Sequence, residues 1–320
     1  MDVTRIAILD DYQNVALDCA NWGSLPKGCD ITVFSQYLGP ESSVIEALQK
    51  FEVIVAMRER TPFPASLIQS LPNLKLLVTT GMRNLAIDMQ AARKQGIPVC
   101  GTAMAPHAAF EHTWALILAI TKNIPREDHS MRAGGWQTGV GVGLNGKTLG
   151  VLGLGKLGSK VARVGLAFDM KVIAWSQNLT EQRAKECGVT LVDKETLFRQ
   201  SDILTIHLIL GERTRGIVGQ NELALMKPSA FLVNTSRGPI VDEDALIERL
   251  LAKAIAGAAI DVYDIEPLPV HHPLRSLENT VLTGHTGYVL RETFELAYGE
   301  ALEDVKAWLD GKPVRVLNEI

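Results

Sequence analysis

The sequence predicts an α/β protein made of two doubly wound domains, each a parallel sheet covered by helices. Strands and helices alternate over the first hundred residues, and a second such series starts at Lys147. The 320 residues are also too many for one hydrophobic core to hold comfortably, so two domains are expected. Ligands of open parallel sheets bind beyond the carboxyl ends of the strands, which directs attention to the loops there.

The composition is that of a globular protein and argues against several kinds of partner. Hydrophobic residues make up 47% of the chain, charged residues 21%, and the formal net charge is −4. This balance gives no electrostatic reason to expect nucleic acid or an anionic membrane as partner. The longest strongly apolar helical run, Thr113–Ile120, is too short to span a bilayer. The first residues lack a signal-peptide pattern and the four cysteines lack metal-site or redox-motif spacing, so we expect a cytoplasmic protein with reduced thiols.

The first series contains five strand candidates separated by helical patterns. The strands are expected at Ile6–Leu9, Ile31–Phe34, Val53–Met57, Leu74–Thr79 and Pro98–Cys100, and the helices near Val44–Phe51, Pro64–Ser70 and Asp88–Lys94. Two loops at strand ends carry polar residues that could bind a ligand, Arg58-Glu59-Arg60 and Gly81-Met82-Arg83-Asn84. For Arg58 and Arg60, an ordinary role as solvated loop charges stays open.

A strong helix is predicted from about His107 to Lys122, after a linker at Gly101–Pro106. His107, Glu111 and His112 lie on this helix. Metal ligation needs at least three converging ligands, and no further cluster is evident, so no metal site is expected. We expect these residues to cap the helix or to pack between domains.

The second series begins with a strand, a glycine turn and a helix. The apolar run Thr148–Leu152 leads into Gly153-Leu154-Gly155-Lys156-Leu157-Gly158, and the apolar residues that follow recur at helical spacing. In the dinucleotide-binding fingerprint the first glycine allows a tight turn, the second lets the backbone approach a pyrophosphate, and the third lets the helix pack on the strand. The phosphates would meet the positive end of the helix dipole. The sequence therefore predicts an NAD or NADP site formed by Gly153, Gly155, Lys156, Leu157 and Gly158.

The next strand candidate, Lys171–Trp175, ends in Ser176-Gln177-Asn178, where this fold would place an acidic residue on the adenosine ribose. Without that carboxylate a 2′-phosphate is not repelled, yet no arginine immediately replaces it. The choice between NAD and NADP therefore stays open. Further strands are expected at Ile203–His207, Phe231–Asn234, Ala256–Ile260 and Val281–Thr283, with helices near Asn221–Met226 and Asp242–Lys253.

A long helix is predicted from about Val289 to Leu309. Because it follows the completed second sheet, we expect it to return to the first domain. The predicted domains are residues 1–103 with 289–320, and an inserted dinucleotide-binding domain of residues 104–288.

Three polar residues, Arg237, Glu266 and His285, follow successive strand candidates in the second series. An arginine fork can bind a carboxylate bidentately and polarise the adjacent carbonyl. A histidine held by a carboxylate can protonate an alkoxide as hydride arrives. Each residue taken alone also has a structural explanation, as a turn residue, a charge before proline or a satisfied core histidine.

Four motifs in this order and spacing resemble the D-isomer-specific 2-hydroxyacid dehydrogenase family over nearly the whole chain. They are LGVLGLGKLGSKVA, LVNTSRGPIVDEDAL, AAIDVYDIEPLP and TGHTG. The resemblance implies that Arg237 binds the substrate carboxylate and carbonyl, that His285 is the acid–base residue, and that Glu266 pairs with it. It implies a Rossmann domain inserted into a flavodoxin-like substrate domain. The implied activity is NAD(P)-dependent hydride transfer between nicotinamide and a small 2-oxo or 2-hydroxy acid.

The resemblance also implies further binding residues and a partner. The cofactor-binding regions would include Ser176, Gln177, His207, Thr235 and Asp261. The stretch TTGMRNLAID resembles the family's substrate loop, whose backbone N–H groups hold the carboxylate, so that Gly81, Met82 and Arg83, with Arg58, are candidate substrate-binding residues. The family is typically dimeric, and the helix at His107–Lys122 belongs to its dimer contact.

The chain departs from the family pattern at several positions, none of which is Arg237, Glu266 or His285. Arg83 stands where a second glycine is usual, Ile209 and Gly211 replace a proline and a threonine, and Ser176 replaces the acidic residue. The last two departures leave the cofactor choice open, although family grounds slightly favour NAD.

The sequence also allows three alternatives to this activity. A formate dehydrogenase fits less well, because that subgroup does not pair its histidine with a glutamate. A dinucleotide-sensing binding protein, like the related transcriptional corepressors, is the alternative from another class. A larger or phosphorylated substrate is also conceivable, given Arg58, Arg60 and Arg83. The sequence does not decide which acid is the substrate.

Overall fold

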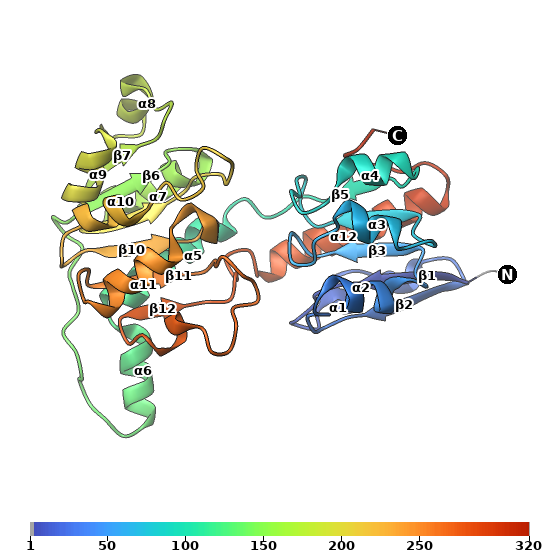
Figure 1. Cartoon of the computed structure of the whole chain (residues 1–320), viewed down its shortest axis with the longest axis horizontal. Helices are drawn as coiled ribbons and strands as arrows, with labels where there is room; N and C mark the ends of the chain where they lie inside the picture. Colours follow the sequence, from blue (N-terminus) through green and yellow to red (C-terminus); the bar gives the residue numbers. More distant parts are fainter. Residues whose placement is uncertain (1–2, 320) are drawn as a thin grey trace. The chain divides into compact units, whose positions relative to one another are not determined.

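A computed structural model describes residues 3–319, which divide into two compact units. The split unit comprises Met1–Pro106 and Val289–Ile320, and the inserted unit comprises His107–Tyr288. Figure 1 shows the chain leaving the split unit after β5 and returning to it with α12.

The split unit has a five-stranded parallel sheet in the order β2-β1-β3-β4-β5. Its strands are β1 (Thr4–Ile8), β2 (Cys29–Val33), β3 (Val53–Ala56), β4 (Leu76–Thr79) and β5 (Val99–Gly101). Every residue of β3, β4 and β5 is buried, as expected for strands covered on both faces. This order is the flavodoxin-like one, whose switch point lies between β1 and β3.

Both ends of the chain build the split unit. Its helices are α1 (Ala16–Cys19), α2 (Glu41–Leu48), α3 (Ala65–Gln69), α4 (Met89–Lys94) and α12 (Arg291–Leu309), with a 3₁₀ turn at Trp22–Ser24. Helix α12 packs against α1 and β4. The Arg315 guanidinium donates to Asp304 of α12 at 3.0 Å, and the Asn318 side chain bonds to the backbone of Ile97 and Val99 beside β5. These contacts fasten the end of the chain to its beginning.

The inserted unit has a seven-stranded parallel sheet in the order β12-β11-β10-β9-β6-β7-β8. Its strands are β6 (Thr148–Leu152), β7 (Lys171–Trp175), β8 (Thr190–Leu191), β9 (Ile203–Ile206), β10 (Phe231–Asn234), β11 (Gly257–Ile260) and β12 (Thr280–Leu282). Its helices are α5 (Ala108–Thr121), α6 (Ile124–Arg132), α7 (Lys156–Ala167), α8 (Glu181–Glu186), α9 (Lys194–Gln200), α10 (Gln220–Leu225) and α11 (Glu243–Leu251), and 3₁₀ turns lie at Gly238–Ile240 and Pro273–Ser276.

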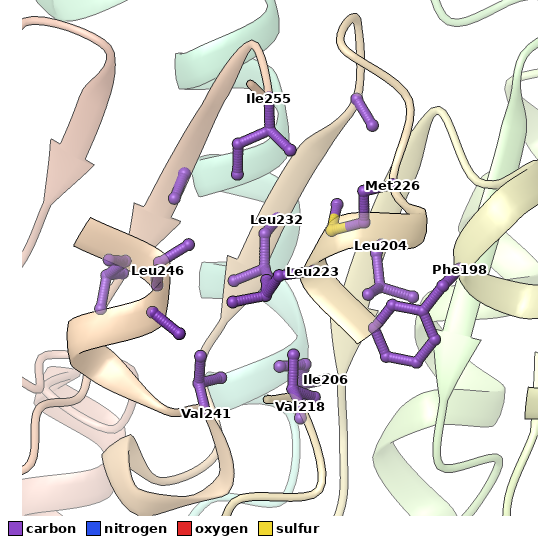
Figure 2. Close-up of a cluster of buried hydrophobic side chains, with 14 of the residues drawn as sticks. Phe198, Leu204, Ile206, Val218, Leu223, Met226, Leu232, Val241, Leu246 and Ile255 are labelled. Carbon is purple, nitrogen blue, oxygen red and sulfur yellow. The ribbon is translucent and has the colours of Figure 1, made fainter. Parts of the chain in front are cut away.

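The two faces of this sheet bury two separate apolar clusters. Successive residues of β10 alternate between them: Phe231 and Val233 join Trp114 and Ile117 of α5, whereas Leu232 faces the helices α9, α10 and α11. Figure 2 shows this second cluster, with Phe198, Leu223 and Leu246 packed onto Leu204 and Leu232 of the sheet. Helices on both faces leave the carboxyl edge of the sheet for the site.

The predicted fold class is confirmed, with the cofactor domain inserted in the chain of the other domain. Several boundaries and small elements differ from the prediction. The helix expected near Val44–Phe51 runs from Glu41 to Leu48, because the extended Pro40 lets it start earlier. The elements α1, α6, α8, α9 and β8 are not among those predicted from the sequence. Helix α6 buries no residue and β8 has two residues, so neither carries a hydrophobic period.

None of the helices within residues 3–319 combines the length and apolar character needed to cross a membrane.

Candidate active site

The cofactor and catalytic candidates of the inserted unit all lie where strands end at the carboxyl edge of its sheet. Along that edge they follow the strand order: His285 after β12, Asp261 and Glu266 after β11, Thr235 and Arg237 after β10, His207 after β9, the glycine loop after β6, and Ser176 and Gln177 after β7. The connections reverse direction between β6 and β9, which makes that position the topological switch point. Parallel pairing therefore brings together residues that are far apart in the sequence.

The three glycines of the loop after β6 meet the three steric requirements predicted for them. Gly153 has φ +104°, and a Cβ there would lie 2.7 Å from the carbonyl oxygen of His207 across the switch point. A Cβ at Gly158 would overlap the carbonyl oxygen of Gly153, so glycine lets α7 pack on β6. At Gly155 a Cβ would meet no atom within 4 Å.

Gly155 is also the N-cap of α7, and no side chain caps this helix end. Lys156 and Leu157 form its exposed first turn. Open space in front of uncapped N–H groups at a helix N-terminus is the environment that a pyrophosphate needs. The residues present thus fit a dinucleotide.

Ser176 and Gln177 line a cavity of about 560 Å³ beside the end of β7. Asp193, the N-cap of α9, lines it too, and its carboxylate accepts hydrogen bonds from the Thr196 hydroxyl at 2.6 Å and backbone N–H at 2.8 Å. These two hydrogen bonds hold the pKa of Asp193 below its usual value. The lining residues include this acidic side chain and neither lysine nor arginine. Asp193 was not among the predicted site residues, because it follows β8, the strand after the one at whose end a ribose-binding acid is expected.

His207 and Thr235 lie between the glycine loop and the catalytic candidates. The His207 Nε2 atom is 2.9 Å from the Thr205 hydroxyl, and burial lowers the pKa of His207 to about 4, which keeps its ring neutral near pH 7. The Thr235 hydroxyl is 2.7 Å from the hydroxyl of Thr113 on α5. Their contact with a cofactor stays a prediction.

The Arg237 loop is shaped by Asn234 at the end of β10. The Asn234 amide donates to the carbonyl of Arg237 at 3.0 Å, and its oxygen accepts from the backbone N–H of Ser236 at 3.0 Å. A Cβ at Gly238 would overlap the backbone of Tyr263, so the loops after β10 and β11 pack backbone against backbone. This packing brings the Arg237 segment against the segment that leads to Glu266.

Glu266 and His285 form a close pair. The Glu266 Oε2 atom is 2.6 Å from His285 Nδ1, and Oε1 accepts from the backbone N–H of Tyr263 at 2.9 Å. The Tyr288 ring meets the imidazole edge-on, with 5.7 Å between centroids. Because the carboxylate accepts the Nδ1 proton, Nε2 is the ring nitrogen left to exchange a proton with a ligand.

The Asp261 side chain is buried and hydrogen-bonded within the protein, whereas a ligand-binding side chain is expected to be accessible. It is 1% exposed, and its carboxylate accepts from the Thr283 hydroxyl at 2.6 Å and from the backbone N–H groups of Thr286 at 2.7 Å and Gly287 at 2.9 Å. Asp261 therefore holds the segment around His285 by hydrogen bonds, a structural role that the sequence did not predict. Its contact with a cofactor stays a prediction.

The two histidines of α5 that the sequence singled out, His107 and His112, have different contacts in the structure. His107 is at the N-cap position, but its side chain makes no capping hydrogen bond, so the capping expectation is wrong for this residue. The backbone of His107 is in the helical region, with φ −104° and ψ −21°, whereas a capping side chain needs an extended N-cap residue. His112 lies one turn further, with Nε2 3.1 Å from the Thr283 hydroxyl and 3.2 Å from Asp261 Oδ1. The sequence offered no signal for this contact, because its partners are far away along the chain.

In the split unit, the candidates Arg58, Gly81, Met82 and Arg83 meet at the ends of the adjacent strands β3 and β4. The Arg58 Nη1 atom lies 2.6 Å from where a Cβ of Gly81 would be, and Gly81 has φ +108°. The Gly81 N–H donates to the Thr102 hydroxyl at 3.2 Å, while Met82 and Arg83 are exposed. Asn84 is buried and its amide donates to the Arg58 carbonyl, which joins the two loops.

Arg60 takes a structural place in the split unit. Its Nη1 donates to the carbonyl of Asp10 at 2.9 Å, and the guanidinium lies over the Tyr12 ring at 4.4 Å from the centroid. It therefore connects the loops after β1 and β3 at the switch point of this sheet, and is not a solvated loop charge.

Comparisons with known proteins agree with this geometry. The model of the D-isomer specific 2-hydroxyacid dehydrogenase NAD binding domain matches residues 114–287. A glyoxylate reductase from Aeropyrum pernix is 38% identical over 307 residues, which cover 92% of this chain and 91% of that protein. A hydroxypyruvate reductase from Thermotoga maritima is 36% identical over 264 residues, which cover 81% of this chain and 84% of that protein.

Solved structures are similar over the whole chain. The crystal structure of a phosphoglycerate oxidoreductase from Vibrio cholerae o395 has 39% sequence identity and a TM-score of 0.91, over 97% of this chain and 100% of that one. The chain spans about half the length of the D-3-phosphoglycerate dehydrogenases that it matches.

Fold and sequence together define an NAD(P)-dependent oxidoreductase that acts on CH–OH donors. The chain belongs to the D-isomer specific 2-hydroxyacid dehydrogenase family, and its activity is that of a 2-hydroxyacid dehydrogenase or, in reverse, a 2-oxoacid reductase. The family resemblance noted from the four motifs is confirmed.

The glycine loop allows a paired test of fold against binding. We expect Gly155→Ala to keep the unfolding midpoint of the wild type and to weaken NADH binding about tenfold or more, because its methyl group enters the space meant for the pyrophosphate. Gly158→Ala should lower the free energy of unfolding by about 1–3 kcal/mol, because its methyl group overlaps the Gly153 backbone. Thermal unfolding and fluorescence titration with NADH measure both effects.

Gly143→Ala is the control, since a Cβ there also meets no atom within 4 Å but lies in the loop before β6. Wild-type NADH affinity in Gly155→Ala would contradict the assignment of this loop to the phosphates.

Proposed function

We propose that this enzyme reduces a small, unphosphorylated 2-oxo acid such as glyoxylate or hydroxypyruvate, with Arg237, Glu266 and His285 as its catalytic centre. The observation that carries the proposal is the 2.6 Å pair between Glu266 and His285, held at a strand end next to the Arg237 loop. The relatives named glyoxylate reductase and hydroxypyruvate reductase match most of this chain and most of their own length, which supports a substrate of that size.

Arg237 supplies the anchor for the substrate. Its guanidinium is charged at any working pH and presents a planar fork that suits a carboxylate. A donor shared between the carboxylate and the adjacent carbonyl oxygen also stabilises the negative charge that grows on that oxygen during reduction. A lysine at position 237 would keep the positive charge but could not bind the carboxylate through two parallel N–H donors.

His285 supplies the proton. With Nδ1–H held by Glu266, the imidazolium donates from Nε2 to the substrate oxygen and is left neutral, while the nicotinamide cofactor supplies the hydride when bound. Glu266 holds the ring in place for this transfer, because its carboxylate oxygen lies 2.6 Å from Nδ1. In the oxidation direction the same nitrogen accepts the proton of the hydroxyl group.

The activity test follows loss of NADH absorbance with glyoxylate, hydroxypyruvate, pyruvate, 3-phosphohydroxypyruvate and an aryl 2-oxo acid. We expect turnover of the smallest acids, a loss of about 10²-fold or more in kcat for His285→Ala, and a similar loss in kcat/KM for Arg237→Ala, because each removes a group that acts on the reacting oxygen. Arg237→Lys should recover only part of the loss.

Arg93→Ala, an exposed arginine in the last turn of α4, is the matched control and should keep wild-type rates. Preferred reduction of the phosphorylated acid would contradict the proposed substrate. Cofactor binding without turnover of any acid would instead support a dinucleotide-sensing role.

For the cofactor we propose a preference for NAD(H) over NADP(H). The cavity beside β7 offers the Ser176 hydroxyl and the Gln177 amide to ribose hydroxyls, and it lacks a lysine or arginine to hold a 2′-phosphate. The ionised Asp193 carboxylate in its lining repels such a phosphate. It thus takes over part of the discrimination that an acid at position 176 would provide.

Binding titrations with NADH and NADPH test the preference. Asp193→Ser keeps an N-cap for α9 and removes the charge, so NADPH should bind about fivefold more tightly while NADH affinity stays constant. Glu195→Gln, an exposed carboxylate two residues along that pairs with Arg199, is the control. Wild-type protein that binds NADPH as tightly as NADH would refute the preference.

We also propose that the chain forms a homodimer through α6 and the segment after it. Helix α6 buries no residue within its own unit and stands away from the sheet (Figure 1). Ile124, Met131, Trp136 and Val140 in and after this helix are 54%, 51%, 73% and 94% exposed. Large exposed apolar side chains that recur within 17 residues of sequence support an interaction surface on this segment.

Sedimentation analysis should give twice the 34.9 kDa chain mass, and Trp136→Ser should shift the protein toward monomer. Leu251→Ser, which alters an exposed leucine on α11, should leave the dimer intact. A wild-type monomer at micromolar concentration would rule the dimer out.

A further inference from the structure

The loop that carries His285 holds a conformation that needs support from outside the loop. We define the loop as Thr283-Gly284-His285-Thr286-Gly287 and call it the histidine loop. His285 has φ +54°, in the left-handed region that residues with side chains adopt rarely. Such residues persist where the surrounding structure fixes them from several directions. The contacts of the histidine loop therefore decide where the imidazole lies.

Asp261 provides most of these contacts. Its carbonyl oxygen accepts the His285 N–H at 2.7 Å, Oδ1 accepts the Thr286 N–H at 2.7 Å, and Oδ2 accepts the Gly287 N–H at 2.9 Å. Three consecutive backbone donors of the histidine loop thus bond to one residue at the end of β11. This arrangement suits an ionised Asp261, because both of its oxygens accept hydrogen bonds and a carboxylate is acceptor-only.

His112 completes this arrangement from α5. Its Nε2 lies between the Thr283 hydroxyl at 3.1 Å and Asp261 Oδ1 at 3.2 Å, and the Thr283 hydroxyl itself donates to Oδ1 at 2.6 Å. Because the threonine proton already goes to the carboxylate, both oxygens near Nε2 are acceptors. Nε2 therefore carries a proton whether the ring is neutral or charged.

The site lacks the features of a metal centre. Within residues 3–319 no group of three histidine, cysteine or acidic side chains converges, so His112 and Asp261 have no third ligand of this kind. A Cβ at Gly287 would lie 3.0 Å from Asp261 Oδ2 and 3.5 Å from Cδ2 of His112, which leaves no room between the histidine loop and α5. The cluster is a closed hydrogen-bond network.

We propose that His112 is a positioning residue for proton transfer: its Nε2–H sustains the Asp261 carboxylate that holds the histidine loop, and with it His285, in place beside Glu266. The proposal rests on the acid–base role proposed for His285. His112 touches neither His285 nor Glu266 in these contacts, and it acts through Asp261.

The charge balance around Asp261 supports this role. Burial raises the pKa of Asp261, but hydrogen bonds from His112 and Thr283 outweigh burial and hold the pKa below its usual value. Within residues 3–319, the titratable residues next to Asp261 are His112 from α5, Tyr263 from its own loop, and His285 of the histidine loop, which contacts Asp261 through its backbone N–H. The only one of these that donates a side-chain hydrogen bond to the carboxylate, within residues 3–319, is His112. Its loss therefore moves the protonation of Asp261 toward neutral pH.

The test compares His112→Leu, which removes the donor, with His112→Gln, whose amide N–H can replace it. Steady-state rates over a range of pH, KM for the 2-oxo acid, the NADH dissociation constant and the unfolding midpoint are measured for each. We expect His112→Leu to lose about tenfold or more in kcat, with KM and NADH affinity within about twofold of wild type. Its kcat should also fall on the acid side at a higher pH than in the wild type, since Asp261 is then protonated more easily. His112→Gln should recover most of both changes.

Glu111→Gln, an exposed change one residue earlier on α5, is the control for effects on the helix and should match the wild type. If His112→Leu does not fold, Thr283→Val removes the hydroxyl that His112 shares with Asp261 and should give the same acid-side loss.

Two results would overturn the proposal. One is a wild-type rate and pH profile in His112→Leu. The other is an equal loss in the Leu and Gln variants with a lowered unfolding midpoint and an unchanged pH profile, which would mean a purely structural role. The variant His285→Ala distinguishes failure of the proposed function from failure of the positioning role. If His285→Ala keeps wild-type activity, the proposed function is wrong. If His285→Ala is inactive and His112→Leu behaves like the wild type, only the positioning role of His112 is rejected.

Discussion

Parallel pairing of the seven strands in the inserted unit is the constraint on which its site depends. Because all strands run the same way, their carboxyl ends form one edge, and β6, β10, β11 and β12 are each followed there by a segment of the candidate site. Helices cover both faces and leave this edge as the accessible side. Loops that end side by side at this edge pack tightly, and Gly153 and Gly238 lie where neighbouring loops approach so closely that no side chain fits.

The sequence predicted most of the fold and the central part of the candidate site, because both depend on local patterns. Apolar runs alternate with helical patterns, and the glycines at 153, 155 and 158 occur at the turn between a strand and a helix. Arg237, Glu266 and His285 could be placed at one edge because each follows a strand candidate, and the family motifs then implied their roles.

The remaining features depend on contacts between distant segments or on elements without a hydrophobic period. The contact of His112 with Asp261 joins α5 to the end of β11, and nothing near either residue in sequence signals it. Arg60 looked like a loop charge, but it lies on Tyr12 from another loop. Asp193 follows β8, a strand of two residues that no periodicity can reveal. Helix α6 is mostly polar, its apolar residues Ile124 and Met131 are exposed, and it buries nothing in its own unit.

The insertion of one unit into the other has a mechanical consequence at the histidine loop. The chain passes between the units twice, after Pro106 and after Tyr288, and the network around Asp261 holds the chain close to both points, through His112 near the start of α5 and through the N–H of Gly287. The histidine loop is thus tied by hydrogen bonds to β11 and α5 of its own unit, although His285 is only three residues from the point where the chain leaves that unit.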